Sequence, residues 1–345
     1  MLVLDVKRTK EDFIKRMGKS SKRSLICCEF KLASFEKFCL KKYNSSLENI
    51  IKELIVVKNP QEQVENVIQN FIDELELQGK PYSTVSNYSS LAKNYLKFRR
   101  VKFDKLELRD NLAYKSEVKE ELYPITKNDI QTLLDHSSFI QKAKIFLQTS
   151  GGFRISELMG LRKCDFNKEL ERYTAYIRPK YAKNQKARTT IISIEAMRYV
   201  DKLIENKNDD DLLFPHNADN IRNAIVSQLN IFDRLRKRVG LEMRYEDKKT
   251  HKITTHSFRA FFVSQFEKTS SGFGHALSGH DRYLKQYERF TIGEKIEKYI
   301  ETEKYLLIYE NPNENSNLKK ELLEMRAKIA RLEELNQGSM YLTGI

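Results

Sequence analysis

Three features are missing from this sequence, and each absence narrows the kind of protein it encodes. The four cysteines form no C-x-x-C pair, and Cys27, Cys28 and Cys39 fall in one apolar helical stretch. We therefore expect them to be small core residues in a reducing compartment. No run of about 20 apolar residues occurs, so no membrane-spanning helix is expected. The first residues lack the apolar core of a signal peptide, which favours a cytoplasmic protein.

Positive charge is what the sequence has in excess. Lysine and arginine number 62 against 48 acidic residues, and the formal net charge is +14. This surplus favours a polyanionic partner, most often nucleic acid, with a soluble basic protein lacking such a partner as the alternative. The chain has 345 residues, 40% of them apolar, which is enough for two domains with ordinary cores.

Helical periodicity dominates the first third of the chain. Apolar residues recur at i, i+3 and i+4 within residues 25–43 and 62–79. Residues 80–100 continue the pattern, with Ser83 or Thr84 as the expected N-cap. The pattern predicts an all-helical domain over residues 1–103. The polar, mixed-charge stretch 104–124 ends at a proline and is interpreted as a linker.

The rest of the chain predicts a second domain over residues 125–311. Residues 142–161 show a helix, a glycine break and a second helix, and helical patterns resume after residue 193. Between them, residues 172–178 and 189–194 predict the arms of a β-hairpin with a lysine-rich loop. The predicted fold class is therefore mainly α with a small β-hairpin or sheet (α+β). Residues 312–345 form a tail with heptad spacing, which indicates either self-association or a helix folded back on its own domain.

Polar residues suited to phosphate chemistry recur through the second domain. An arginine follows the glycine break, with Glu157 three residues later in a position to orient it. A lysine lies in the hairpin loop, and a histidine and an arginine three residues apart share one helix face. A second histidine follows a glycine and precedes a tyrosine by seven residues. In chain order these residues are Arg154, Lys183, His256, Arg259, His280 and Tyr287.

These residue types can together cut DNA without a metal ion. Tyrosine can act as a covalent nucleophile, but its pKa of about 10 requires an electropositive site. Two arginines can hold the non-bridging oxygens of a phosphate and stabilise the charge that builds in the transition state. A flexible lysine can protonate the departing 5′-oxygen, and histidines can transfer protons or donate hydrogen bonds.

In this order the residues resemble the catalytic domain of tyrosine recombinases and phage-type integrases. The segment SGGFRISELMGLRKCDF resembles the first arginine box of that family, and AKNQKAR resembles the hairpin loop, which selects Lys183 over Lys180 and Lys186. THSFRAFF resembles the His-x-x-Arg box, and LSGHDRYLKQYERF resembles the Gly-His and tyrosine segment. YSTVSNYSSLAKNYLKF is similar to the last helix of the family's helical core-binding domain. The resemblance spans residues 10–310.

The resemblance implies a site-specific recombinase or integrase that acts on double-stranded DNA without a cofactor or metal ion. It implies a core DNA-binding domain at residues 1–103, a dimer on each site and a tetramer when two sites are joined. Residues 292–310 would dock on a neighbouring protomer. The source would be a prokaryotic cytoplasm, near the nucleoid, or a virus or mobile element. The implied roles are phosphate binding by Arg154 and Arg259, general acid catalysis by Lys183, proton transfer or hydrogen bonding by His256 and His280, and nucleophilic attack by Tyr287.

Several alternatives stay open at this point. The spacing between Gly-His and the tyrosine is shorter than usual and looks like archaeal integrases, so Tyr283 is a second candidate nucleophile. His256, His275 and His280 allow a metal site, although no carboxylate or cysteine lies at ligand spacing. A type IB topoisomerase would share the chemistry, and a DNA-binding regulator derived from an integrase would lack it. The sequence does not specify the target site, nor does it separate integrase from resolvase and transposase.

Overall fold

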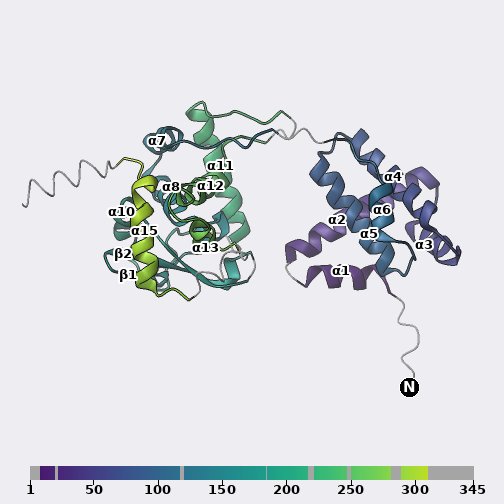
Figure 1. The fold of residues 1–345 in the computed structure, drawn as a ribbon, viewed down its shortest axis with the longest axis horizontal. Helices are drawn as coiled ribbons and strands as arrows, with labels where there is room; N and C mark the ends of the chain where they lie inside the picture. The colour runs from purple at the N-terminus through teal and green to yellow at the C-terminus, as the bar shows by residue number, and fades with distance from the viewer. Residues whose placement is uncertain are drawn as a thin grey trace, which may run out of the picture. The chain divides into compact units, whose positions relative to one another are not determined.

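The computed structural model describes residues 8–19, 22–116, 120–183, 185–216, 221–246, 250–280 and 289–309. The chain divides into two compact units, which change over between Glu120 and Glu121, with a short stretch at Glu246 grouped with the first. Each unit has a hydrophobic core of its own. The helices and strands of both are labelled in Figure 1.

The N-terminal unit is helical throughout its described part. Its core is built from aromatic side chains as well as aliphatic ones: the rings of Phe35 and Phe71 lie 4.9 Å apart, and those of Phe13 and Tyr95 lie 5.2 Å apart. Such pairs bury large apolar areas and restrict how the helices can pack. The helices are α1 (Lys10–Gly18), α2 (Lys22–Tyr43), α3 (Leu47–Val56), α4 (Gln61–Leu77), α5 (Tyr82–Phe98) and α6 (Lys105–Asn111).

Helix α5 begins earlier than the sequence suggested. Its N-cap is Pro81, whose carbonyl oxygen accepts hydrogen bonds from the amides of Thr84 and Val85 at 2.8 and 3.1 Å. Ser83 and Thr84, the expected caps, lie inside the first turn, so that prediction was wrong. The reason is that the proline already holds the extended backbone angles of an N-cap, with φ −66° and ψ 150°.

The stretch 104–124, interpreted from sequence as a linker, begins as part of the N-terminal unit. Asp104 caps α6 by accepting hydrogen bonds from the amides of Leu106 and Glu107 at 2.7 and 2.9 Å. Leu108 is fully buried in the core, and Gln69 of α4 exchanges two hydrogen bonds with the backbone of Ala113. Weak apolar periodicity concealed this helix because a seven-residue helix needs few buried positions to be held in place.

The C-terminal unit packs helices around a central pair, α8 (Phe139–Gly151) and α12 (Thr255–Phe266). The core is rich in phenylalanine, and Phe258, Phe262 and Phe266 of α12 are fully buried. The remaining helical elements are α7 (Lys127–Asp135), α9 (Ile155–Met159), α10 (Ile194–Ile204), α11 (Ile221–Arg238), α13 (Phe273–Ser278), α15 (Ile292–Leu306) and the 3₁₀ turns η1 (Lys163–Asp165) and η2 (Pro179–Tyr181).

A three-stranded antiparallel sheet in the order β1-β2-β3 completes this unit. Strands β2 (Arg172–Ile177) and β3 (Arg188–Ile191) form the predicted hairpin, with Thr174 opposite Ile191 and Ile177 opposite Arg188. Strand β1 (Phe166–Glu169) pairs with β2 but was not foreseen. Its residues are exposed or half-buried and carry no alternating apolar pattern, so only pairing with β2 identifies it. The predicted fold class, mainly helical with a small sheet, is confirmed.

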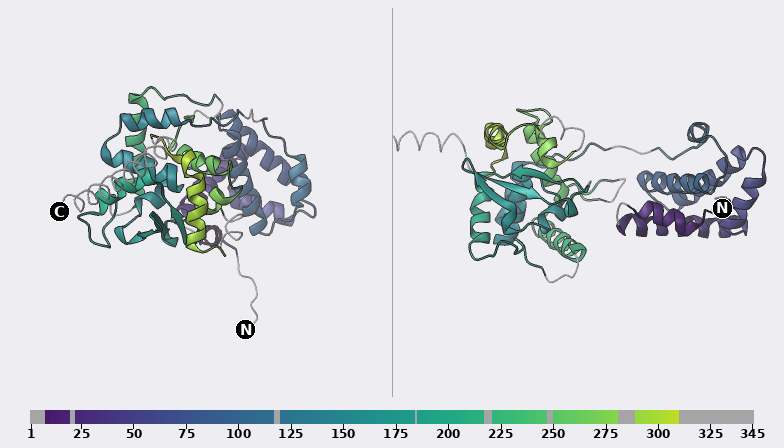
Figure 2. Two further views of the ribbon diagram at one scale, coloured as in Figure 1. Left: turned by 60° about the vertical axis from the view of Figure 1, so that its left-hand side comes forward. Right: turned by 90° about the horizontal axis from the view of Figure 1, so that it is seen from below.

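Helix α15 packs on its own unit, against α8 and α12 (Figure 2). Its Ile296 and Tyr299 are fully buried, and the Tyr299 hydroxyl donates a hydrogen bond to the carbonyl oxygen of Ser150 at 2.8 Å. Glu303 forms a buried ion pair with Arg172 of β2 at 2.7 Å. These contacts make α15 part of this unit's core, where sequence had suggested docking on a neighbouring protomer.

No helix in the described ranges is long and apolar enough to cross a membrane. The heptad tail at residues 312–345 lies outside the described residues, so its two interpretations stay predictions.

The hydroxyl of Tyr299 gives a direct test of how α15 is held. Tyr299→Phe should lower the free energy of unfolding by about 1–3 kcal/mol, because the carbonyl of Ser150 is left buried without its donor. Urea unfolding followed by far-ultraviolet circular dichroism measures the change. Tyr305→Phe is the matched control on the same helix, since its hydroxyl makes no hydrogen bond within the described structure, and should change stability by less than about 0.5 kcal/mol. Equal effects of the two substitutions would contradict this role of Tyr299.

Candidate active site

The site begins at the glycine break after α8. Gly152 has a left-handed backbone, with φ +63°, and a Cβ placed on it would lie 2.6 Å from the ring of Phe262. Only glycine fits this position, since other residues rarely adopt this conformation and have no room here. Thr190 of β3 donates a hydrogen bond to the carbonyl oxygen of Gly151 at 2.9 Å, which ties the turn to the sheet. The turn places Arg154 at the N-cap of α9.

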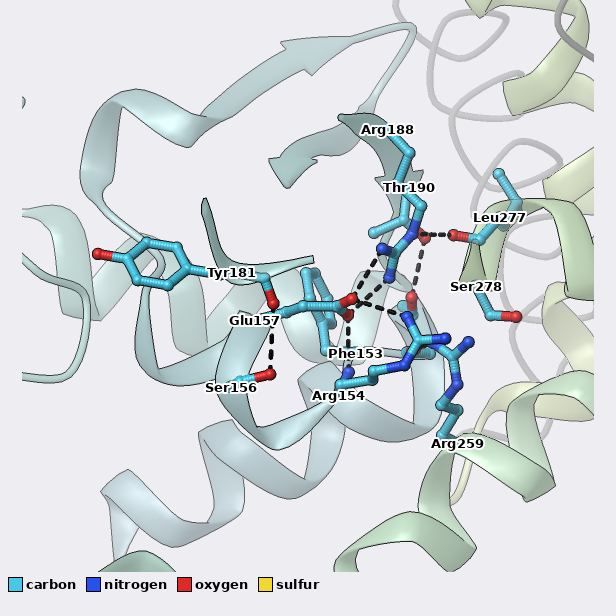
Figure 3. A network of polar contacts seen from close by, with 12 residues as sticks. Phe153, Arg154, Ser156, Glu157, Tyr181, Arg188, Thr190, Arg259, Leu277 and Ser278 are labelled. Carbon is cyan, nitrogen blue, oxygen red and sulfur yellow. Dashed lines mark hydrogen bonds and ion pairs between the residues drawn. The ribbon is translucent and has the colours of Figure 1, made fainter. Parts of the chain in front are cut away.

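A buried carboxylate organises the residues around this turn (Figure 3). The side chain of Glu157 has no exposed surface. Its Oε1 accepts hydrogen bonds from Nη1 of Arg154 at 2.9 Å and Nη1 of Arg188 at 2.8 Å. Its Oε2 accepts from the backbone amide of Arg154 at 2.8 Å and from Nη2 of Arg188 at 2.7 Å. Both oxygens are therefore satisfied by charged or backbone donors, as a buried carboxylate requires.

The arginines keep Glu157 ionised despite its burial. Burial by itself would raise the pKa of the Glu157 carboxyl. The hydrogen bonds and charge of Arg188, followed by those of Arg154, outweigh that effect and lower the pKa below its usual value. The carboxylate therefore carries a full negative charge at neutral pH.

Arg259 of α12 joins the cluster from the other side. Its side chain is among the largest that are fully enclosed, with 2% of the residue exposed. Nη1 donates to the carbonyl oxygen of Gly152, while Nη2 is buried without a hydrogen-bond partner among the described residues. Burial, followed by the charge of Arg154, lowers the pKa of Arg259 to about 9, so the guanidinium stays charged at neutral pH. A buried guanidinium with one N–H group lacking an acceptor destabilises the folded protein. An anion that accepts a hydrogen bond from this group would offset that cost.

Counted over the described residues that meet at Glu157, the cluster has more positive than negative charge. Three guanidinium groups, from Arg154, Arg188 and Arg259, surround the single carboxylate of Glu157, which leaves a formal excess of two positive charges. Figure 3 shows the guanidinium groups of Arg154 and Arg259 lying next to each other, and their charges lower the pKa of the histidines nearby. Such an arrangement is suited to an anion with several acceptor oxygens, for example a phosphate.

Histidines line a pocket of about 330 Å³ beside Arg259. His256 stands at its exposed rim, and partial desolvation, followed by the charges of Arg259 and Arg154, lowers the pKa of its imidazole. His280 is half-buried, and desolvation, followed by the charge of Arg259, lowers its pKa to about 4. Its Nδ1 lies 2.5 Å from Nδ1 of His275. His280 is therefore neutral at neutral pH and acts as a hydrogen-bonding group.

Four of the six predicted site residues are brought together. The charge of Arg154 lowers the pKa of Arg259, and the charges of both arginines lower the pKa values of His256 and His280, so these four residues are neighbours. Their roles stay predictions. Lys183 is exposed in the connection between β2 and β3, and in the described part of the chain no hydrogen bond joins it to the other site residues. That connection is anchored near the site, since the Ser156 hydroxyl donates to the carbonyl oxygen of Tyr181 at 3.4 Å.

Tyr287 and its alternative Tyr283 lie outside the described residues, so the choice between them stays a prediction. The alternative of a metal centre gains no support. Among the described residues, no group of three or more histidine, cysteine or acidic side chains is arranged to hold a metal ion.

Sequence reasoning missed Arg188, the second partner of Glu157. It selected a lysine from the hairpin loop and ignored the arginine that follows. One signal was available: in the strand RTTI, Arg188 and Thr190 alternate onto the same face, and both are buried. A charged residue on the inward face of a strand requires a buried partner of opposite charge.

Comparison with known proteins finds similarity over part of the chain to one protein family, and similarity in fold to solved structures. Residues 123–272 match the model of the phage integrase family. The described fold is similar to that of lambda integrase in a dimer bound to a COC′ core site, with a TM-score of 0.54, 15% identity and coverage of 82% of this chain and 99% of that chain. A second lambda integrase dimer structure gives a TM-score of 0.53 and 17% identity over 81% of this chain and 77% of that chain. An integrase of the transposon Tn1549 in complex with right-end DNA gives 0.49 and 18% identity over 79% and 98%. No curated protein matches the chain.

The low pKa of His280 can be tested without DNA. Its imidazole should stay neutral from pH 8 to about pH 5, because the pKa is lowered to about 4. Because the folded protein then binds fewer protons than the unfolded chain, this residue should destabilise the fold as the pH falls below 6.5. Histidine NMR titration, assigned with His280→Gln, measures the pKa, and inorganic phosphate should raise it by compensating Arg259 and Arg154. Titration of His280 near pH 6.5 would contradict the electrostatic account.

Proposed function

We propose that this protein, whose residues 123–272 form a phage integrase family domain in a chain with the tyrosine-recombinase fold, is a site-specific DNA recombinase. It cuts and rejoins duplex DNA through a covalent phosphotyrosyl intermediate. The observation that carries the proposal is the arginine site itself. Among the residues that the structure describes, Arg259 is a buried guanidinium with one donor that lacks a partner, and it lies beside Arg154 in a cluster of three arginines and one carboxylate.

The reaction follows from the chemistry of these groups. The scissile phosphate binds between Arg154 and Arg259, which donate hydrogen bonds to its non-bridging oxygens and stabilise the charge of the transition state. The Tyr287 phenol loses its proton to water, which the electropositive site favours, and the phenolate oxygen attacks phosphorus, forming a 3′-phosphotyrosyl bond as the bond to the 5′-oxygen breaks. Lys183 gives its proton to that departing oxygen. His280, neutral at neutral pH, and His256 donate hydrogen bonds to the phosphate.

Rejoining reverses these steps with a different strand. A 5′-hydroxyl attacks the phosphotyrosyl bond, releases the tyrosine and restores the phosphodiester. The energy of the phosphodiester is kept in the covalent link, so no nucleotide cofactor is needed. Exchange between two sites uses two protomers on each, and the lambda integrase structures similar to this chain are dimers bound to a core site. A mobile-element or virus source belongs to this proposal, since the structures similar in fold include lambda integrase.

The N-terminal unit supplies a second contact with DNA. A hollow of about 300 Å³ on this unit is lined by Arg8, Arg16, Lys97 and Lys105 together with Phe13, Met17, Asn94 and Phe98, and none of the described residues in its lining is acidic. Four cations around one hollow match the backbone phosphates of a duplex. Three of these cations lie within residues 1–103, which supports that range as the core DNA-binding domain, and Lys105 lies just beyond it on α6. The arginine cluster supports residues 125–311 as the catalytic domain.

The first test is trapping of the covalent intermediate. DNA junctions made in cells that express the protein are sequenced to identify the site, which is then built as a nicked duplex that prevents rejoining. The wild type should accumulate a covalent protein–DNA adduct that resists denaturation. Tyr287→Phe should abolish the adduct and leave DNA binding unchanged, because only the nucleophilic oxygen is lost. An adduct that survives in Tyr287→Phe and disappears in Tyr283→Phe would transfer the role to Tyr283.

Two other outcomes would overturn the proposal. Absence of any adduct with the wild type would favour a non-catalytic DNA-binding regulator. Relaxation of supercoiled plasmids that carry no recombination site would favour a type IB topoisomerase.

The hollow on the N-terminal unit predicts a change in salt dependence. Log K for DNA binding falls with log salt concentration, and Lys97→Gln should make this negative slope shallower by about 0.9, the value for one lost phosphate contact. Fluorescence anisotropy at several salt concentrations measures the slope. Lys41→Gln is the matched control: Lys41 pairs with Glu74 at 2.9 Å and does not line the hollow, so the slope should be unchanged. Equal slopes for both variants would exclude the hollow as a DNA contact.

A further inference from the structure

The two arginines that bind Glu157 share its carboxylate unequally. Arg188 donates through Nη1 and Nη2 to both carboxylate oxygens, and its Nε donates to the carbonyl oxygen of Leu277 at 2.9 Å. Its guanidinium is buried and points away from solvent, with 5% of the side chain exposed. Arg154 gives only one side-chain hydrogen bond to the carboxylate, through Nη1, and its side chain is 21% exposed. All three side-chain nitrogens of Arg188 thus donate to acceptors of the protein, while Arg154 retains donors that can bind a ligand.

The way in which Arg188 and Arg154 bind Glu157 determines how much positive charge remains available to a phosphate. A bidentate arginine–carboxylate pair is close to neutral as a unit. With Arg188 in place, Glu157 is compensated, and Arg154 and Arg259 retain their positive charges. Without Arg188, the carboxylate would compensate Arg154 instead and would hold the guanidinium that the phosphate needs.

We propose that Arg188 is a positioning residue that neutralises Glu157, so that the charge of Arg154 remains available to the scissile phosphate. The proposal rests on the proposed function and assigns to Arg188 an indirect part in it. Arg188 touches neither the phosphate nor the attacking tyrosine oxygen in this scheme.

Arg188 also connects this cluster to the end of α13, which leads into His280. Its Nε holds the carbonyl oxygen of Leu277 near the end of α13. A Cβ on Gly279 would lie 2.9–3.0 Å from the Arg188 side chain, and Gly279 has a left-handed φ of +79°. The glycine of the Gly-His pair is therefore needed where the chain passes over Arg188. The Arg188 guanidinium therefore compensates the charge of Glu157 and also positions the backbone that leads to His280.

The test compares two substrates that differ only in charge. One is the nicked duplex with a normal scissile phosphate. The other carries a methylphosphonate there, which has no negative charge and so needs less help from cationic groups. The variants are Arg188→Met and the double variant Glu157→Gln/Arg188→Met, which removes the carboxylate together with its partner. Arg172→Met is the matched control, because Arg172 forms another buried ion pair of this unit, with Glu303, and contacts α15 rather than the site.

Each variant has a distinct expected result. On the normal phosphate, Arg188→Met should form the covalent adduct about 10- to 100-fold more slowly than the wild type, less than the ~10²- to 10³-fold typical for loss of a direct oxyanion contact. On the methylphosphonate, the deficit should shrink markedly. The double variant should recover much of the rate on the normal phosphate, because the amide oxygen of the glutamine can still accept a hydrogen bond from Arg154 and orient it, but carries no charge that competes with the phosphate. Arg172→Met should show the same rate ratio to the wild type on both substrates.

The opposite results would overturn the proposal. If Arg188→Met is impaired equally on both substrates, the residue supports the fold and does not set the charge of the site. If the double variant is as slow as Arg188→Met, Glu157 does not compete for Arg154. If Arg188→Met fails to fold, the rates on the two substrates are compared for Arg188→Lys and for the double variant instead. The double variant leaves no buried carboxylate unpaired. A wild type that forms no adduct on either substrate would refute the proposed function itself, which is a different outcome from a charge-independent deficit.

Discussion

The carboxylate of Glu157 is the point on which the site depends. It is fully enclosed, and a buried charge of this kind is tolerated only when its hydrogen bonds are satisfied and its charge is compensated. Arg188 from β3 and Arg154 at the start of α9 provide both. The consequence reaches beyond stability, because the carboxylate fixes the direction of Arg154 and so determines where an anion can bind.

The same cluster places a buried cation beside further positive charge. Arg259 is buried with one donor lacking a partner in the described structure, and two positive charges remain uncompensated. An arrangement of this kind destabilises the empty protein and stabilises a bound phosphate, and it needs little reorganisation when charge builds during the reaction. The low pKa values of His256 and His280 follow from the same excess of positive charge together with desolvation. The histidines are therefore neutral donors at neutral pH rather than additional cations.

Much of this protein can be predicted from its sequence, because the signals are local. Helical periodicity identified α2, α4, α5 and α12, and β-branched and aromatic residues identified the hairpin. The order of the motifs predicted six site residues, and the structure brings four of them together. Each of these signals depends on residues within a few positions of one another, where spacing along the chain determines spacing in space.

What only the tertiary structure decided involves contacts between distant segments. Helix α6 and the packing of α15 on its own unit depend on partners far along the chain. Strand β1 pairs with the neighbouring β2, but its own residues show too weak a pattern to identify it. The choice of Arg188 as the partner of Glu157 is of the same kind, since the two residues are 31 positions apart. The sequence by itself determined which groups could bind a phosphate. The folded chain decided which guanidinium pairs with the carboxylate of Glu157 and which keeps donors for an anion. That choice depends on the position of each side chain in three dimensions.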